Sequence, residues 1–400
     1  MRILTILLPL FMIVHSGSVL HFQTNIQLSV YTTEGIMLNH KDHFHGSDLE
    51  EIEAIYHIKK EDITSFSANI NPLGISGNLR AQLAAHLDAI TTYPDRNYKK
   101  LRECIGAYCG INTDSVIVGN GSTELISLTI SCITPKHALI LGPTYSEYER
   151  EVSLQGGQTR YYPLREEQNF RMNVSDFCSH LTDDLDLVVL CNPNNPTSSA
   201  ITNDEMRQIL DAALQHGIFV LVDETYVEFA NDVSKITSVP LTRYYTNLLV
   251  LRGTSKFFAA PGLRLGYAVT GNRDLARQIS IRQNPWTITS LADIAGQLMF
   301  RDQNYMSETR SLISSERERI YNLLQTWPSV QPYEPSANFM LVKIIKEDVD
   351  ADQLFDHCIR KGLMIRNCST FPFLSNRYFR FCFMLPEQND RLLAAITELL

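Results

Sequence analysis

Between residues 115 and 251, short apolar runs alternate along the chain with amphipathic segments. Each apolar run is followed at once by small or polar residues. The five runs are 116–118, 138–141, 185–191, 218–222 and 248–251. Short continuous apolar runs are typical of strands buried on both faces, and the longer segments between them have helical spacing. The pattern predicts an α/β fold, in which a doubly wound, mostly parallel sheet forms the middle of three layers.

On either side of this region, the pattern of apolar and polar residues is different. Before it, helical spacing predicts helices near 49–56, 78–90 and 101–109. After residue 285, a helix that runs to about 327 with a break near 300–305 precedes strands near 337–342, 362–366 and 377–383 and a helix at 351–361. This mixture predicts a smaller α+β domain. The expected organisation is a leader (1–36), an N-terminal arm that contributes to the small domain (37–90), a large domain (91–285) and a C-terminal small domain (286–400).

The fifth apolar run ends in Gly253-Thr254-Ser255-Lys256, which presents one lysine among apolar and small residues. Arg264 follows eight residues later. Burial lowers the pKa of a lysine because its ammonium form is desolvated, and the neutral amine can then form a Schiff base with a carbonyl. An isolated Ser-Lys pair is more often a surface turn, so the other loops have to decide between the two interpretations.

The loops that follow the other runs offer complementary groups. Asp223 follows four apolar residues, and a carboxylate buried there needs either strong hydrogen bonds or a cationic partner, such as a protonated pyridine nitrogen, to stay ionised. Gly119-Asn120-Gly121-Ser122-Thr123-Glu124 stands where a helix would begin, which favours an anion such as phosphate. Asn195 and Tyr226 can donate hydrogen bonds to a phenolate-type oxygen. Tyr145 offers a ring face for stacking. Taken singly, these groups have plainer explanations: a metal or phosphoryl-transfer site for Asp223, a capped helix for 119–124, an Asn-Pro turn for Asn195 and a place in the core for Tyr145.

Taken together and in order, Asn195-Pro196-Thr197, Asp223-x-x-Tyr226 and Ser255-Lys256 with Arg264 resemble the signature of the class I/II aminotransferases. These are fold-type-I enzymes that depend on pyridoxal 5'-phosphate (PLP), and the resemblance extends from residue 37 to the C-terminus. It implies that Lys256 is the Schiff-base lysine and that Asp223 pairs with the pyridine nitrogen. It also implies cofactor contacts from Gly121, Ser122, Thr123, Tyr145, Asn195, Tyr226, Ser255, Arg264 and, from the neighbouring subunit of a homodimer with a shared active site, Tyr93.

Two positions depart from the pattern of the family. Gly253 stands three residues before the lysine, where many relatives have Ser or Thr, so that Thr254 or Ser255 has to supply that hydroxyl or it is absent. Ser198 replaces the glycine of the common Asn-Pro-Thr-Gly motif, which changes the turn but keeps the asparagine.

Within the family, histidinol-phosphate aminotransferase and threonine-phosphate decarboxylase of cobalamin synthesis are the subfamilies that the sequence resembles most. Segments 65–74, 119–126 and 365–371 and the pair His45-Gly46 are more similar to the decarboxylase. The resemblance implies a small phosphorylated amino-acid substrate whose acidic group meets Arg380, with Arg366, Arg377, His45 and Asn69 as weaker candidates for binding it. We predict decarboxylation of O-phospho-threonine or a close relative, with transamination as the alternative.

Composition and charge argue against several other classes of function. A formal charge of -9 offers no footprint for nucleic acid or for an anionic membrane surface, and it argues against a non-catalytic sensor fused to a DNA-binding domain. The eight cysteines show no Cys-x-x-Cys pair, which predicts free thiols, no metal site and a reducing compartment.

The first residues complicate the choice of compartment. The apolar run 3–14 resembles a secretory signal and is too short to span a bilayer. A start of translation at Met37 is the interpretation that we favour, with a cytoplasmic location.

Overall fold

The computed structural model of the protein describes residues 48–400. His45 and the predicted leader 1–36 therefore lie outside the described residues. Within the described part, no helix is long and apolar enough to cross a membrane. The division into the four segments given above stays a prediction.

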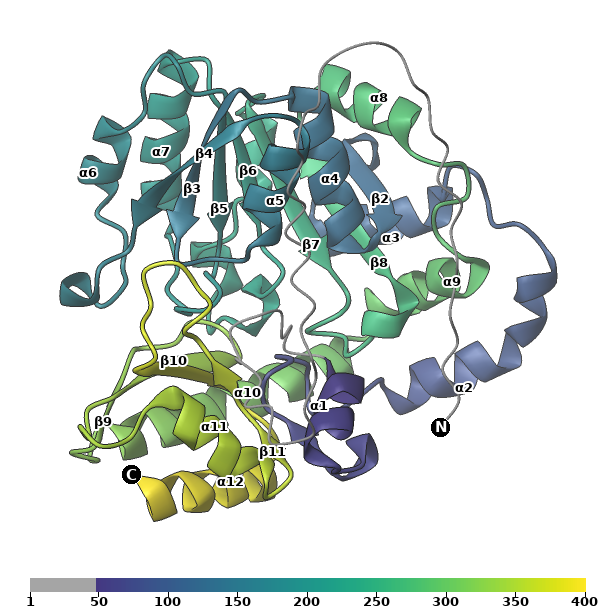
Figure 1. The fold of residues 1–400 in the computed structure, drawn as a ribbon. Helices are drawn as coiled ribbons and strands as arrows, with labels where there is room; N and C mark the ends of the chain where they lie inside the picture. Colours follow the sequence, from purple (N-terminus) through teal and green to yellow (C-terminus); the bar gives the residue numbers. More distant parts are fainter. Residues whose placement is uncertain (1–47) are drawn as a thin grey trace, which may run out of the picture. The chain divides into compact units, whose positions relative to one another are not determined.

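The larger of the sheets has seven strands in the order β2-β8-β7-β6-β5-β3-β4 (Figure 1). The strands are β2 (Val116–Asn120), β3 (His137–Gly142), β4 (Gln158–Pro163), β5 (Leu187–Cys191), β6 (Phe219–Asp223), β7 (Leu248–Gly253) and β8 (Leu265–Thr270). Strands β7, β6, β5, β3 and β4 are parallel, whereas β8 is antiparallel to both β7 and β2. The prediction of a mostly parallel sheet is confirmed.

Two strands of this sheet were not among the five predicted runs. β4 lies at the edge of the sheet, and its mixed exposed and partly buried residues give no continuous apolar run. β8 returns from the lysine loop and is inserted between β2 and β7. The insertion brings Gly266 so close to the backbone of Gly121 and Ser122 that a Cβ at Gly266 would lie 2.5 Å from the Ser122 nitrogen.

Both faces of the large sheet are covered, because successive residues of the buried strands enter different hydrophobic cores. In β5, Val188 and Leu190 belong to one core and Leu187 and Val189 to the other. The first core is shared with α3 (Lys99–Cys109), α6 (Val174–Ser179), α7 (Asn203–Gln215) and α9 (Ser290–Met299). The second is shared with α4 (Gly121–Ile133), α5 (Glu147–Leu154) and α8 (Arg273–Arg282).

The C-terminal part of the chain forms an antiparallel sheet in the order β12-β13-β10-β9. Its strands are β9 (Val330–Pro332), β10 (Phe339–Ile344), β12 (Arg366–Asn367) and β13 (Tyr378–Cys382). The accompanying helices are α10 (Gln303–Leu324), α11 (Ala351–Ile359) and α12 (Pro386–Leu399) (Figure 1). The predicted break near 300–305 is present, because α9 ends at Met299 and the side chain of Asp302 caps a new helix by accepting a hydrogen bond from the backbone of Tyr305.

The N-terminal segment is joined to this C-terminal part by a short parallel sheet. β1 (Thr64–Ser65) pairs with β11 (Leu363–Met364), and Thr64 lies opposite Leu363. The helices α1 (Leu49–Tyr56) and α2 (Gly77–Ala85) lie on either side of β1 in the sequence, close to the predicted helical segments. Residues 66–71, which follow β1, are thereby carried toward the ends of the large-sheet strands.

The carboxyl-terminal ends of three neighbouring parallel strands of the large sheet lie side by side. Cys191 of β5 lies opposite Asp223 of β6, and Asp223 lies opposite Leu251 of β7. Because these strands are parallel, the loops that follow them leave from the same edge of the sheet, where ligands collect in such folds. These are the loops that carry Asn195, Tyr226 and Lys256.

Candidate active site

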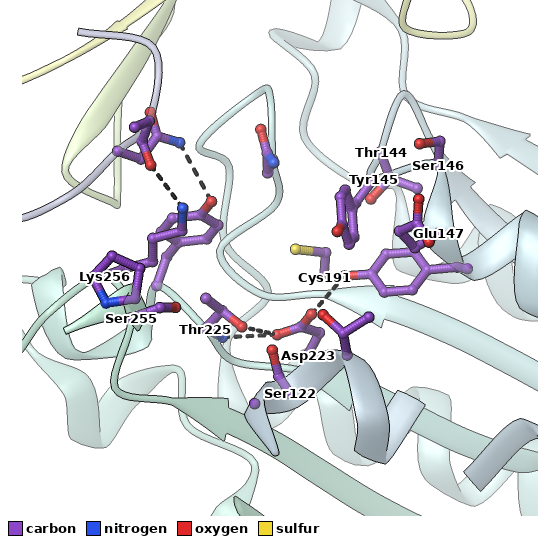
Figure 2. Close-up of a pocket in the computed structure, with 18 of the residues that line it drawn as sticks. Ser122, Thr144, Tyr145, Ser146, Glu147, Cys191, Asp223, Thr225, Ser255 and Lys256 are labelled. Carbon is purple, nitrogen blue, oxygen red and sulfur yellow. Dashed lines mark hydrogen bonds between the residues drawn. The ribbon is translucent and has the colours of Figure 1, made fainter. Parts of the chain in front are cut away.

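A cavity of about 860 Å³ lies where these loops meet residues 67–70 and the C-terminal sheet (Figure 2). Most of the side chains proposed from the sequence line it: Asn69, Gly121, Ser122, Thr123, Tyr145, Asn195, Asp223, Tyr226, Ser255, Lys256, Arg264, Arg366 and Arg380. Arg377 is not among the lining residues and instead donates hydrogen bonds to the carbonyls of Ile344 and Val349.

Tyr93 is the other proposed residue that does not line the cavity. Its side chain is 77% exposed, and its ring lies 4.6 Å from the ring of Trp286. It therefore cannot contribute to the cavity of its own chain, and its role in a neighbouring subunit stays a prediction.

Lys256 is the group that the loop after β7 presents to the cavity. Its Nζ donates a hydrogen bond to the carbonyl of Ala68 at 2.7 Å. Burial, with smaller contributions from Arg380 and Arg264, lowers the pKa of Lys256 to about 8. The ammonium form therefore still predominates at pH 7, but the neutral amine that a nucleophile requires is far more abundant than in an ordinary lysine with a pKa of 10.5.

Asn71 fixes the backbone on which Lys256 stands. Its backbone N–H donates a hydrogen bond to the carbonyl of Lys256 at 3.0 Å, and its side-chain nitrogen Nδ2 donates one to the carbonyl of Phe257 at 2.8 Å. Asn71 is 2% exposed, so these bonds are shielded from water. Residues 68–71 thus hold the lysine both at its ammonium group and at its backbone.

Asp223 lies at the end of β6 and is 5% exposed. One carboxylate oxygen, Oδ1, accepts hydrogen bonds from the backbone and hydroxyl of Thr225, and the other, Oδ2, accepts one from the hydroxyl of Tyr148 at 2.8 Å (Figure 2). Burial raises the pKa of Asp223, and these donors oppose the rise. Within residues 48–400, no lysine, arginine or histidine is hydrogen-bonded to this carboxylate. The site therefore suits a cationic ligand at Asp223.

Arg264 and the start of α4 form a second polar part of the cavity. Gly121 has a φ of 75°, and a Cβ at this position would collide with the guanidinium of Arg264. Only glycine allows both the left-handed backbone and this close approach. The amides of the first turn of α4 have no partner within the helix and stand beside a guanidinium, which is a suitable environment for a phosphate group.

The small-domain arginines enter the cavity from the antiparallel sheet. Arg366 of β12 and Arg380 of β13 are directly opposed, and opposed residues in antiparallel strands point to the same face. Arg380 donates hydrogen bonds to Asn195 Oδ1 and to the carbonyl of Ser67. Burial and the nearby Arg380 lower the pKa of Arg366 to about 10. Two guanidiniums at one wall of the cavity favour a ligand with more than one negative charge.

The two departures from the family motif have structural outcomes. Thr254 is fully buried and donates its hydroxyl to the carbonyl of Leu265 at 3.0 Å, so it does not face the cavity. Ser255 does line the cavity and is the hydroxyl available next to the lysine. Ser198 is also fully buried, with a φ of 61°, and its hydroxyl accepts a hydrogen bond from the backbone of Ala337. The serine thus links this turn to the C-terminal part of the chain.

Several lining residues were not proposed from the sequence. Tyr148 and Thr225 bind Asp223, Ser67 and Ala68 supply carbonyls to the two cationic side chains, and 370–372 line the cavity beside Arg366. Thr225 lies inside the Asp223-x-x-Tyr226 motif and could have been proposed as a local hydrogen-bond donor to Asp223. The other contacts join distant segments, and no local pattern indicates them.

Comparison with known proteins identifies the family of this chain. The sequence profile of the family described as aminotransferase class I and II matches residues 61–396. The chain belongs to this family. Its members depend on PLP, so this is a PLP-dependent enzyme of fold type I.

Two curated relatives and one solved structure are particularly similar to this family member. A protein of Caldanaerobacter subterraneus, provisionally named threonine-phosphate decarboxylase, is 35% identical over 83% of this chain and 89% of its own length. Threonine-phosphate decarboxylase of Salmonella typhimurium is 31% identical over 89% of this chain and 96% of its own. The crystal structure of histidinol-phosphate aminotransferase from Clostridium acetobutylicum is 32% identical, with a TM-score of 0.78, over 83% of this chain and 98% of the other.

The residues of the cavity fit the cofactor of the family. Asp223 offers a buried carboxylate without a cationic partner among the described residues, and Gly121 with Arg264 offers a site for phosphate. Thr144 Oγ1 and Asn69 Oδ1 are buried polar atoms that have no hydrogen-bond partner within residues 48–400. Buried polar atoms in folded proteins are normally paired, so these two are available to a ligand.

Proposed function

We propose that this protein decarboxylates an O-phosphorylated amino acid of the O-phospho-threonine type, releasing carbon dioxide and a phosphorylated amino alcohol. The observation that carries the proposal is the position of Arg366 and Arg380, side by side on β12 and β13, at the wall of the cavity that contains Lys256. A substrate with a carboxylate and a phosphate matches two adjacent guanidiniums. The two relatives named threonine-phosphate decarboxylase support the choice of reaction.

The cofactor would be held from several sides. Lys256 would bond to its aldehyde carbon, Asp223 would accept the proton of its pyridine nitrogen, and Arg264 with the backbone of Gly121, Ser122 and Thr123 would bind its phosphate. Asn195 and Tyr226 would contact the ring oxygen, and Tyr145 would lie on the ring face. When bound, PLP withdraws electrons from the α-carbon of the substrate.

The substrate would be oriented by the C-terminal sheet and residues 67–69. Arg380 is held by Asn195 and the carbonyl of Ser67, which suits it to bind the substrate carboxylate in one fixed direction. Arg366 and Asn69 would bind the remaining polar groups. Breaking the bond between the α-carbon and the carboxylate releases carbon dioxide and leaves an electron pair, and Lys256 Nζ would supply the proton that the α-carbon then takes up.

Transamination is the second candidate, and the solved structure of histidinol-phosphate aminotransferase from Clostridium acetobutylicum is the observation that favours it. In that reaction Lys256 would remove a proton from the α-carbon instead of supplying one to it. The two reactions use the same lysine, and they differ in which substituent of the α-carbon is directed for cleavage.

A pair of incubations distinguishes the two reactions. Purified protein is mixed with PLP and O-phospho-L-threonine, with and without 2-oxoglutarate, and carbon dioxide and amine products are measured. The decarboxylase produces carbon dioxide and a phosphorylated amine in both mixtures, and the Lys256→Ala variant produces neither. Keto-acid formation that requires 2-oxoglutarate, without carbon dioxide, would refute decarboxylation in favour of transamination.

We further propose that the enzyme is a homodimer in which Tyr93 of one subunit reaches the cofactor phosphate of the other. The exposed side chain of Tyr93 supports this, as do Leu87 and Ile90, which are 56% and 68% exposed in the preceding turn. A Tyr93→Ala variant is expected to weaken PLP binding only in the dimer, as measured by PLP titration alongside sedimentation. The cytoplasmic compartment stays part of the proposal.

A further inference from the structure

Tyr148 of α5 is a buried tyrosine that neither the family motifs nor the proposed reaction uses. It is 1% exposed, and its hydroxyl donates to Asp223 Oδ2 at 2.8 Å. The other donors to this carboxylate come from Thr225, two residues further along the same loop. Tyr148 is 75 residues away in sequence, so it is the contact that ties Asp223 to a second element of the fold.

The pKa values of Tyr148 and Asp223 determine which of the two groups donates this hydrogen bond. Burial and the neighbouring Asp223 raise the pKa of Tyr148 well above its usual value, so the tyrosine keeps its proton and acts as the donor. Burial raises the pKa of Asp223, and the bonds from Thr225 and Tyr148 lower it. A donated hydrogen bond stabilises the ionised carboxylate in surroundings that would otherwise favour the neutral acid.

The ring of Tyr148 has a second contact in the same site. Its centroid lies 5.6 Å from that of Tyr145 with an interplanar angle of 85°, which is an edge-to-face arrangement. Tyr145 is the side chain proposed to lie on the cofactor ring. One residue therefore touches both the group proposed for the ring face and the group proposed for the ring nitrogen.

A buried tyrosine hydroxyl does not need a carboxylate as its acceptor. Tyr98, which is 5% exposed, donates to the backbone carbonyl of Ile288 at 3.0 Å. The hydroxyl of Tyr267, which is 1% exposed, lies 3.5 Å from the thiol of Cys109, and no carboxylate within residues 48–400 accepts a hydrogen bond from it. The pairing of Tyr148 with Asp223 thus goes beyond what burial of a hydroxyl requires.

We propose that Tyr148 is a positioning residue that keeps Asp223 ionised and directed into the cavity, and thereby tightens the binding of PLP. The inference rests on the proposed cofactor site. Tyr148 acts through Asp223 and does not itself touch the substrate. Its hydroxyl occupies one side of Oδ2, which leaves the remaining acceptor capacity of the carboxylate for the protonated pyridine nitrogen.

The test is a titration of the cofactor-free protein with PLP, followed by absorbance. Tyr148→Phe removes one oxygen and keeps the ring against Tyr145, and a hydrogen bond to a charged group corresponds to roughly a tenfold to hundredfold loss of affinity. Tyr267→Phe is the matched control, because it removes a buried hydroxyl that does not contact Asp223, and its affinity is expected to stay within about twofold of the parent. Urea unfolding of each cofactor-free protein shows that both are folded.

Two further variants test whether Tyr148 affects PLP binding by acting on Asp223. In a protein that already carries Asp223→Asn, Tyr148→Phe is expected to reduce the affinity for PLP little further, because the carboxylate charge that the Tyr148 hydroxyl stabilises is gone. Tyr148→His returns an N–H donor and is expected to bind PLP more tightly than Tyr148→Phe. The inference is overturned if Tyr148→Phe binds PLP as tightly as the parent, or if its effect persists in full without the Asp223 carboxylate. A parent protein that binds no PLP would instead refute the cofactor site itself, and with it the proposed function.

Discussion

Replacing Lys256 by Met is expected to stabilise the cofactor-free protein at neutral pH. The lysine is partly buried and stands near two arginines, and its pKa falls from 10.5 to about 8. The folded protein therefore bears a cost for keeping the ammonium ion inside the cavity. At about 1.4 kcal/mol for each pKa unit, that cost is about 3.5 kcal/mol. The hydrogen bond to Ala68 offsets about 1 kcal/mol of it, which leaves a net gain of about 2.5 kcal/mol for the Met variant.

The effect depends on pH with a definite sign. Below pH 8 the lysine is protonated in both the folded and the unfolded chain, and the full cost of burial is present. Between pH 8 and 10.5 the folded lysine loses its proton while the unfolded lysine keeps it. Because the unfolded chain then binds more protons, the stability of the parent rises with pH relative to the variant. Above pH 10.5 the cost has disappeared.

Urea unfolding of the cofactor-free proteins at pH values from 7 to 10.5 measures this difference. Taking the parent minus the Met variant removes the contribution of the other titrating groups. Lys136→Met, at an exposed lysine, is the matched control and is expected to show no such trend. A difference between parent and Lys256→Met that stays constant across this range would show that the buried ammonium is not the cause.

Two other substitutions test parts of the site. Gly121→Ala and Gly156→Ala both place a side chain at positive φ, with φ of 75° and 78°, and each is expected to cost about 1 kcal/mol of stability in urea unfolding. Only Gly121→Ala would displace Arg264, so it alone should weaken PLP binding, roughly tenfold, and equal affinities in a PLP titration would contradict the proposed phosphate site. Arg252→Met is expected to destabilise the fold by about 3–5 kcal/mol, since it leaves Glu224 and Glu228 buried without their cation. Urea unfolding checks this, and an unchanged midpoint would contradict it.

Much of the site could be predicted because its residues follow buried strands. Asp223 and Lys256 come after runs whose apolar character is visible locally, and parallel strands bring the loops after them to one edge. The residue types in those loops then indicated a site that binds PLP. The same reasoning located the break before α10 and the alternating elements of the large sheet.

Contacts between distant segments were decided by the tertiary structure. The pairing of β1 with β11 brings the carbonyls of Ser67 and Ala68 to Arg380 and Lys256, and no pattern within 64–71 indicates that placement. The edge strand β4 was missed because it has water on part of its surface and so lacks a continuous apolar run. The choice between Thr254 and Ser255 also depended on which hydroxyl finds a carbonyl acceptor across the sheet.

The contact between Tyr148 and Asp223 shows the difference between what the sequence determines and what only the tertiary structure determines. The sequence by itself determined that a carboxylate at the end of β6 would be buried and would need a partner, because hydrophobic burial is encoded in the run that precedes it. Which donor holds that carboxylate depends on how α5 packs on β3 and β4, which brings the Tyr148 hydroxyl to Asp223 across 75 residues of chain. Burial is a property of local composition, whereas a hydrogen bond between distant residues exists only after the chain has folded.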